Sequence, residues 1–216
     1  TAQGAIAATR GKEIPVVFTA VTDPVSSRLV KDLKDHHPHI TGIIDYPPLD
    51  KQIELMKQVL PTVKTIGVMY NPGESNSVSV IETFKEKAQE GGLKVIEGPV
   101  NKTADITMAF RKLHAKGVQV IYVPQDNAVV SAMPQLAALS YSQKIPVFTS
   151  DNGSVKDGAL ACISYSYYTV GQKTGSYVVR LIQGEKATAL PITTPDTYPL
   201  YVHTKAEERL GITFQQ

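Results

Sequence analysis

Short apolar runs rich in β-branched residues alternate along the chain with segments whose apolar residues recur every three or four positions. The short runs are typical of strands covered on both faces, and the longer spacing gives a helix one apolar side. This alternation predicts an α/β fold with parallel sheets. The predicted strands are Ile14 to Thr19, Ile40 to Ile44, Thr65 to Tyr70, Leu93 to Glu97, Val118 to Val123, Pro146 to Thr149 and Ala159 to Ile163.

Helical spacing is clearest in three segments. Each is amphipathic and ends just before glycine, a residue that commonly terminates helices. We therefore expect these segments to cover the sheets. They are Ser77 to Glu90, Thr103 to Ala115 and Tyr168 to Gln183.

Two stretches of the chain resemble each other. AIAATRGKEIPVVFTAVTDPV, from Ala5, and LAALSYSQKIPVFTSDNGSV, from Leu136, both contain a small-residue helix end, an Ile-Pro-Val strand, and Thr and Asp after that strand. Common α/β usage is one explanation, and two lobes built on one plan is the other, which we favour. The predicted first lobe spans residues 1–45 and is rejoined by about 164–190. The predicted second lobe spans 46–163, with about 191–216 returning near the hinge.

The two predicted lobes differ in size. Five strand candidates lie between residues 46 and 163, enough for a complete doubly wound lobe, whereas two precede Tyr46. We therefore expect the first lobe to be incomplete, as if the sequence started in its middle.

Polar residues directly follow four of the predicted strands. In open α/β sheets, ligands bind beyond the carboxyl ends of the strands, so these residues are the candidates for a binding site. They are Thr22 and Asp23, Asn71 to Ser77, Gln125 to Asn127, and Ser150 to Asn152.

The stretch VMYNPGESNS, Val68 to Ser77, joins a strand end to a helix start. Pro72-Gly73 predicts a turn, and Ser75 or Asn76 is the expected helix cap. Free N–H groups near Ser77 would then form a small site for an anion such as a carboxylate. The alternative is a well-capped helix whose hydroxyls bond only to their own backbone.

Asp126 and Asp151 bring negative charge to neighbouring strand ends. Two carboxylates facing a hydroxyl-rich helix start could hold an ammonium group while the helix holds a carboxylate, as an α-amino acid requires. Alternatively, each aspartate is a turn or cap residue. Both aspartates lie just after a predicted strand, and this repeated position favours the binding role.

Composition excludes several classes of function. With 22 basic and 20 acidic residues, the net charge of +2 lacks the excess that a nucleic-acid surface normally requires. No apolar run approaches the ~20 residues of a membrane span, and the first residues resemble no signal segment, which leaves open a leader removed earlier. The single Cys162 rules out an internal disulfide, and its setting predicts buried packing.

Catalytic and metal-binding patterns find little support. The sequence contains no G-x-S-x-G elbow, Walker loop or H-E-x-x-H motif. The segment DHHPH contains His36, His37 and His39, but it precedes a strand in a polar connection, which favours a solvated loop over a metal site. We predict no enzyme, no metal and no cofactor.

The run SYSYY, Ser164 to Tyr168, lies where the second lobe should return the chain to the first. Its tyrosines either line a cleft and stack on a ligand or pack a hinge. The sequence does not distinguish these roles.

Several motifs in fixed order carry a family resemblance over essentially the whole chain. They are IPVVFTAVTDPVSS, TGIIDYPPLDKQIELMKQVLP, IGVMYNPGESNS, IYVPQDNAVVSA, IPVFTSDNGSVKDGALA and YYTVGQKTGSYVVRLIQGEKA. Through these motifs the chain resembles the periplasmic or lipid-anchored substrate-binding proteins of ABC importers, in the subfamily associated with tryptophan and other aromatic amino acids. The resemblance implies a type I periplasmic-binding-protein fold, with two Rossmann-like lobes that close on a ligand.

The resemblance also implies roles for the residues at the strand ends. The ligand carboxylate would bind Asn71, Ser75, Asn76 and Ser77, and the amino group would bind Asp126 and Asp151. Thr22 and Asp23 would approach from the first lobe on closure. Asn127 belongs to the same candidate set, and Gln125 stands where similar sequences often carry threonine.

Members of this family begin with a signal sequence or lipobox and further units of lobe one, so we expect this chain to be a fragment. The implied location is periplasmic or at the cell surface, and the implied partners are an amino acid-like ligand and the importer's permease subunits. Other amino acids, short peptides and small amides stay open as ligands.

Two rival functions stay open at this point. One is the effector domain of a transcriptional regulator, which shares the two-lobed fold but needs a helix-turn-helix. The other is a small α/β hydrolase with Asp126 or Asp151 as general base.

Overall fold

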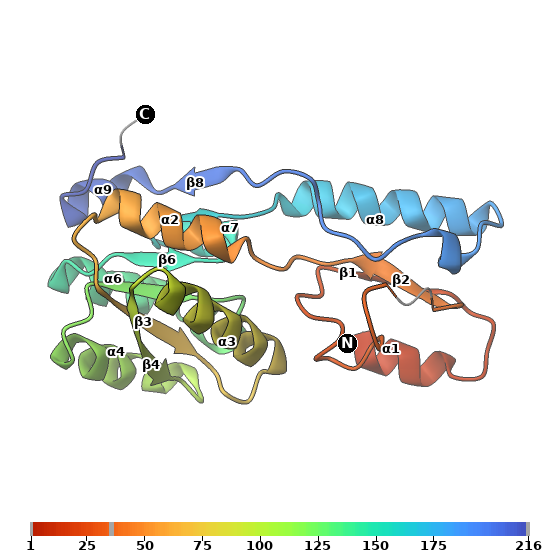
Figure 1. The fold of residues 1–216 in the computed structure, drawn as a ribbon, viewed down its shortest axis with the longest axis horizontal. Coiled ribbons are helices and arrows are strands. Elements are labelled where there is room, and N and C mark those ends of the chain that lie inside the picture. Colours follow the sequence, from red (N-terminus) through yellow and green to blue (C-terminus); the bar gives the residue numbers. More distant parts are fainter. Residues whose placement is uncertain (1, 35–36, 215–216) are drawn as a thin grey trace. The chain divides into compact units, whose positions relative to one another are not determined.

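The computed structural model describes residues 2–34 and 37–214, which form two compact units (Figure 1). Unit 1 contains the residues up to Tyr46 together with Tyr165–Tyr198, and unit 2 contains Pro47–Ser164 and the residues from Pro199 onward. The chain thus passes between the units after residues 46, 164 and 198. The last passage lies at residue 198, later than the return expected near residue 191, because residues 190–194 run beside a strand of unit 1.

Unit 2 is built on one six-stranded sheet in the order β4-β3-β5-β6-β7-β8. All neighbouring strands are parallel except the last pair, which is antiparallel. The strands are β3 (Thr65–Tyr70), β4 (Lys94–Pro99), β5 (Val120–Val123), β6 (Val147–Thr149), β7 (Ala161–Ile163) and β8 (Leu200–Val202).

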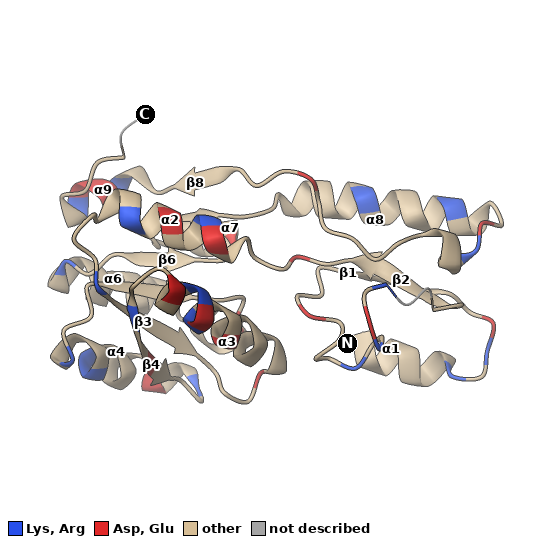
Figure 2. Ribbon diagram, in the orientation of Figure 1, with Lys and Arg blue, Asp and Glu red and all other residues tan. Residues whose placement is uncertain are grey.

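Helices pack on both faces of this sheet because successive side chains of a strand point to opposite faces. Ile121 and Val123 join an apolar cluster with residues of α4 and α6, whereas the ring of Tyr122 stacks on Phe84 of α3. Strands β5, β6 and β7 contain no charged residue, and charges gather on helices such as α2, α3 and α4 (Figure 2). The helices are α2 (Leu49–Val59), α3 (Ser75–Glu90), η1 (Thr103–Asp105), α4 (Ile106–Ala115), α5 (Asn127–Val130), α6 (Met133–Gln143), α7 (Asn152–Lys156) and α9 (Thr204–Leu210).

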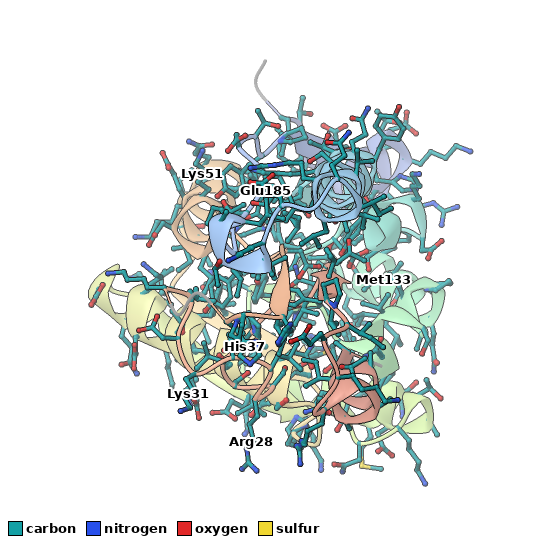
Figure 3. The ribbon with its side chains drawn as sticks, turned by 90° about the vertical axis from the view of Figure 1, so that its right-hand side faces the viewer. Arg28, Lys31, His37, Lys51, Met133 and Glu185 are labelled. Carbon is teal, nitrogen blue, oxygen red and sulfur yellow. The ribbon has the colours of Figure 1, made fainter. Side chains whose placement is uncertain are left out.

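Unit 1 contains the parallel pair β1 (Val16–Thr19) and β2 (Ile40–Ile43). Phe18 packs in a cluster with residues of α1 (Ala2–Thr9), and Ile43 packs with Tyr177 of α8 (Tyr167–Ile182). The described part of the connection between β1 and β2 contains turns rather than a helix, and Arg28, Lys31 and His37 lie along it (Figure 3).

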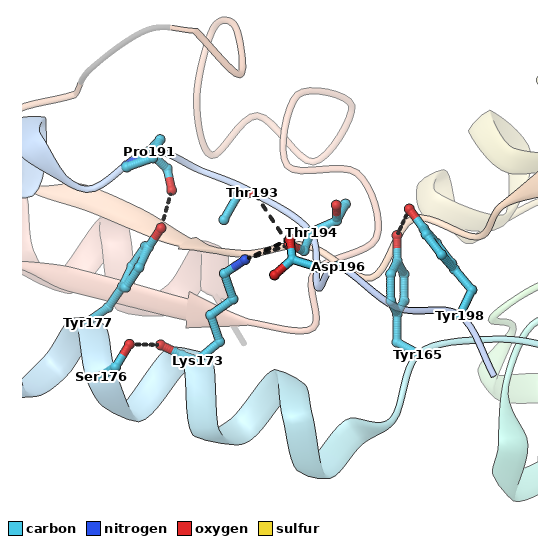
Figure 4. Close-up of polar contacts among 9 residues, drawn as sticks. All are labelled: Tyr165, Lys173, Ser176, Tyr177, Pro191, Thr193, Thr194, Asp196 and Tyr198. Atoms are coloured by element: carbon cyan, nitrogen blue, oxygen red, sulfur yellow. Dashed lines mark hydrogen bonds and ion pairs between the residues drawn. The ribbon is translucent and has the colours of Figure 1, made fainter.

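A return segment after the short helix η2 (Ala187–Ala189) completes unit 1. Its Thr193 forms a parallel bridge with Ile43 of β2, and the Ile44 N–H donates to the Thr193 carbonyl at 2.9 Å. Figure 4 shows α8 tied to the same segment. There the Tyr177 hydroxyl donates to the Pro191 carbonyl at 2.7 Å, and the Lys173 ammonium donates to the Thr194 carbonyl at 2.9 Å.

The predicted α/β fold with parallel sheets is confirmed. Each predicted strand segment overlaps a strand, and the ends of that strand lie within two residues of the predicted ends. β1 starts at Val16, two residues later than expected, after Pro15, which has no N–H to donate to a ladder. β8 was not predicted, because three residues with an exposed Leu200 give no clear period. Among the described residues, no helix is both long enough and apolar enough to span a membrane.

Candidate ligand-binding site

The strand order of unit 2 reverses at β3. From β3 the chain moves outward to β4 on one side and then continues with β5 on the other. The crevice at such a reversal, beyond the carboxyl ends of the strands, is where open α/β sheets bind ligands. The loops that follow Tyr70 of β3 and Val123 of β5 therefore form the candidate site.

Hydrogen bonds tie these two loops together. The Asn71 N–H donates to Oδ2 of Asp126 at 2.6 Å, and Nδ2 of Asn76 donates to the Gln125 carbonyl at 2.8 Å. The Ser77 hydroxyl also approaches that carbonyl, at 3.4 Å. The structure thus brings together the residues that the sequence placed at the ends of β3 and β5.

Asp126 is a buried helix cap, with 1% of its surface exposed. Its Oδ1 accepts from the Val129 N–H at 2.9 Å at the start of α5, and its carboxylate also bonds to Ser77. Burial raises the pKa of Asp126, and the N–H groups of Asn71 and Val129 partly oppose this shift. The cap interpretation therefore holds for Asp126, and its contact with an ammonium group stays a prediction.

Asp151 caps the next helix, α7, in the same way. Its Oδ1 accepts from the Ser154 N–H at 2.8 Å, and its Oδ2 accepts from the Ser154 hydroxyl at 2.7 Å. The register Val123↔Thr149 places the ends of β5 and β6 side by side, as the sequence predicted. Both aspartates accept hydrogen bonds that cap helices, so a ligand would have to use their remaining acceptor sites.

The start of α3 differs from the prediction. The helix begins at Ser75, and its cap residue is Glu74, whose side chain makes no capping hydrogen bond, so the expected cap by Ser75 or Asn76 is wrong. The side chains of Asn76 and Ser77 turn instead to the Gln125 carbonyl. The N–H groups of the first helical turn have no intrahelical acceptor, and their binding of an anion stays a prediction.

The turn before α3 is present as predicted. The Gly73 N–H donates to Oδ1 of Asn71 at 2.9 Å, and the Glu74 N–H donates to the Asn71 carbonyl at 3.0 Å. Asn71 thus uses its side-chain oxygen to hold the turn. Its side-chain NH₂ group remains the part that a ligand carboxylate would contact.

The sequence interpretation gave no individual role to two polar residues that shape this edge. Gln52 of α2 is fully buried, and its Nε2 donates to the carbonyls of Thr149 and Ile163 at the ends of β6 and β7. Glu74 accepts hydrogen bonds from the start of α5. Gln52 is a polar residue on the buried side of a helix, a signal that could have been noticed. Glu74 lay within the candidate run Asn71 to Ser77, but no local pattern indicated its contact with α5.

Thr22 and Asp23 lie in unit 1, just after β1. Thr22 is buried, and the carboxylate of Asp23 accepts from the N–H groups of Val25 and Ser26 at 3.0 and 2.9 Å. Ala20 between β1 and these residues has a φ of 50°, which is unusual for a residue other than glycine. Asp23 therefore stabilises a turn here, and its contact with a ligand stays a prediction.

Other residues noted in the sequence have packing roles. The Tyr165 hydroxyl donates to the Tyr46 carbonyl at 2.8 Å, and its ring lies 4.7 Å from that of Tyr198 (Figure 4), so Tyr165 packs within unit 1. Tyr168, by contrast, is 75% exposed. Burial raises the pKa of the Cys162 thiol to about 12, in agreement with an inert buried cysteine.

The histidine segment is only partly within the described residues, because His36 lies outside them. The His39 N–H donates to Nδ1 of His37 at 3.2 Å. Within the described ranges, no group of three or more His, Cys, Asp or Glu is arranged to hold a metal ion.

Comparison with known proteins identifies the family. The family model for "ABC transporter substrate binding protein" matches residues 1–216. The chain belongs to this family.

Individual relatives agree with this membership of the substrate-binding family. A tyrosine-binding protein of Clostridioides difficile (strain R20291) is 36% identical over 203 residues, which are 94% of this chain and 58% of that relative. A crystal structure of a conserved domain protein from Vibrio cholerae is 39% identical with a TM-score of 0.90, covering 100% of this chain and 72% of the other. An ABC domain in complex with L-Trp, from Streptococcus pneumonia, is 35% identical with a TM-score of 0.88, covering 98% and 71%.

This substrate-binding protein therefore has the predicted periplasmic-binding-protein fold. It spans less than two thirds of the length of the tyrosine-binding relative.

Proposed function

We propose that this protein is the solute-binding component of an ABC importer and that its ligand is an aromatic amino acid. The observation that carries the proposal is the uncapped start of α3 at the strand-order reversal of unit 2. Relatives that are 35–36% identical are named for binding tyrosine or contain L-Trp, which supports an aromatic amino acid as the ligand class.

The ligand carboxylate binds the N–H groups of the first turn of α3, from Ser75 to Ser77, with the Asn71 side-chain amide beside them. Helix N-termini favour anions because their N–H groups are unpaired and the helix dipole is positive there. The side chains of Asn76 and Ser77 hold the loop after β5, so their role is to fix this geometry.

The ligand ammonium binds the carboxylates that follow the strands. Asp126 and Asp151 each retain acceptor capacity beyond their cap hydrogen bonds, because a carboxylate offers about four lone-pair sites. Thr22 and Asp23, in the turn that follows β1, are further candidate contacts for the ligand. Asn127 is exposed next to Asp126 and supplies a further amide.

The proposed work is capture and delivery, with no bond made or broken. A substrate-binding protein of an importer delivers its ligand to the permease subunits, which we propose as its partners. It would act outside the cytoplasm, in the periplasm or anchored at the cell surface. The rival regulator and hydrolase functions receive no support from the relatives at 35% identity or more.

A thermal-shift screen against the twenty amino acids tests this function. A ligand at a hundred times its dissociation constant stabilises the folded state by ~2.7 kcal/mol, which raises Tm by a few degrees. We expect shifts with L-tryptophan, L-tyrosine or L-phenylalanine and none with the acidic and basic amino acids. An absence of any shift would refute the proposed ligand class.

A further inference from the structure

Glu74 links the two loops of the candidate site. It is the last residue before α3, and its carboxylate reaches the start of α5. Oε2 accepts from the N–H and Nδ2 of Asn127 at 3.1 and 2.6 Å, and Oε1 accepts from the Ala128 N–H at 3.4 Å. The residue thus connects the β3–α3 turn to a segment that is 53 residues later in the sequence.

These contacts fix the groups on both sides of the strand-order reversal. Glu74 directly precedes Ser75, whose N–H belongs to the first turn of α3, and it orients the side-chain amide of the exposed Asn127. The first N–H groups of α5 are then occupied by Glu74 and Asp126. The start of α3, which has no side-chain cap among the described residues, remains the place for an anion.

We infer that Glu74 is a positioning residue for ligand binding, and this inference rests on the proposed function. It holds the α3 start and Asn127 in a fixed arrangement before the ligand arrives. Binding sites whose groups are already ordered avoid the entropic cost of ordering them on binding. Without this carboxylate, the turn and the start of α5 would have to be ordered by the ligand itself.

Three variants test this role. In Glu74→Ala, the dissociation constant for L-tryptophan or L-tyrosine should rise about tenfold, equivalent to ~1.4 kcal/mol. Glu74→Gln should recover part of the affinity because its amide oxygen still accepts from Asn127. The matched control Glu86→Ala removes an exposed glutamate from α3, the helix that Glu74 precedes, and should leave affinity unchanged.

Isothermal titration calorimetry measures ligand affinity, and thermal unfolding measures stability. Together they distinguish a positioning role of Glu74 from a general effect on the stability of the fold. An affinity loss in Glu74→Ala that persists well below its Tm supports the inference. A lower Tm with an unchanged dissociation constant overturns it, as does equal weakening in the Glu86→Ala control.

Amide hydrogen exchange provides a readout that needs no ligand. The amides of Asn127 and Ala128 should exchange faster in Glu74→Ala than in the unchanged protein. The amides at the start of α3 should also exchange faster. If the unchanged protein binds no aromatic amino acid, the proposed function fails. Hydrogen exchange then still tests whether Glu74 links the two loops. Equal exchange in both proteins would overturn that link.

Discussion

Replacing Phe84 by alanine should destabilise unit 2 by about 3–5 kcal/mol, the usual cost of removing a buried aromatic side chain. Phe84 of α3 is fully buried, and its ring stacks on Tyr122 of β5 with centroids 4.3 Å apart and planes within 10°. The stacked pair contributes about 0.5–1.5 kcal/mol beyond its buried area. Urea unfolding followed by circular dichroism measures the change.

Phe84→Leu is the matched control, because leucine keeps most of the apolar volume and loses the ring pair. We expect the leucine variant to lose less than about half of the unfolding free energy that the alanine variant loses. The effect bears on the site because the Tyr122 hydroxyl lies 2.5 Å from the Ser150 hydroxyl, at the end of β6. Equal stability of the alanine variant and the unchanged protein would contradict the packing of α3 on β5.

Replacing Asp126 by alanine should cost about 2–4 kcal/mol, because it removes a helix cap and leaves donors without their acceptor. The Asn71 and Val129 N–H groups both donate to this carboxylate. Thermal and urea unfolding measure the loss. Ala128→Gly, on the same short helix, provides a control for general weakening of α5.

The cost of Asp126→Ala should depend on pH. Burial raises the pKa of Asp126 above its value in the unfolded chain, which is about 3.9. The carboxyl group's contribution to stability is then complete below that unfolded pKa and declines as pH rises through the folded pKa. The stability difference between the two proteins should therefore be larger near about pH 4 than at neutral pH. A stability difference that grows as pH rises would contradict burial as the dominant influence on the pKa of Asp126.

Local sequence patterns predicted much of the fold. Short apolar runs rich in β-branched residues located the seven predicted strands, because a strand that is covered on both faces is a continuous apolar segment, as in β2, β3, β5 and β6. The positions of Asn71, Asp126 and Asp151 just after strands followed directly from this. Their proximity at one sheet edge followed from the parallel arrangement.

The detailed hydrogen bonding of the site could not be predicted in this way. Gln52 bonds to carbonyls that are 97 and 111 residues away, and Asp126 accepts from an N–H that is 55 residues away. Such contacts depend on how the strands are ordered, which a local pattern does not specify. The cap of α3 was assigned wrongly for the same reason, since Asn76 and Ser77 bond to the loop after β5 instead of their own helix.

The most direct test of the account compares Ser75→Pro with Ser75→Ala in titrations with L-tryptophan and L-tyrosine. Proline is tolerated at the first helical position, and the extended backbone of Glu74 (φ −100°, ψ 109°) suits a residue before proline. Both variants lose the hydroxyl, but only proline removes the N–H assigned to the ligand carboxylate. We predict near-normal affinity for Ser75→Ala and a dissociation constant raised about tenfold or more for Ser75→Pro, with little change in Tm. Equal affinity of the two variants would contradict the assignment of the carboxylate to the start of α3.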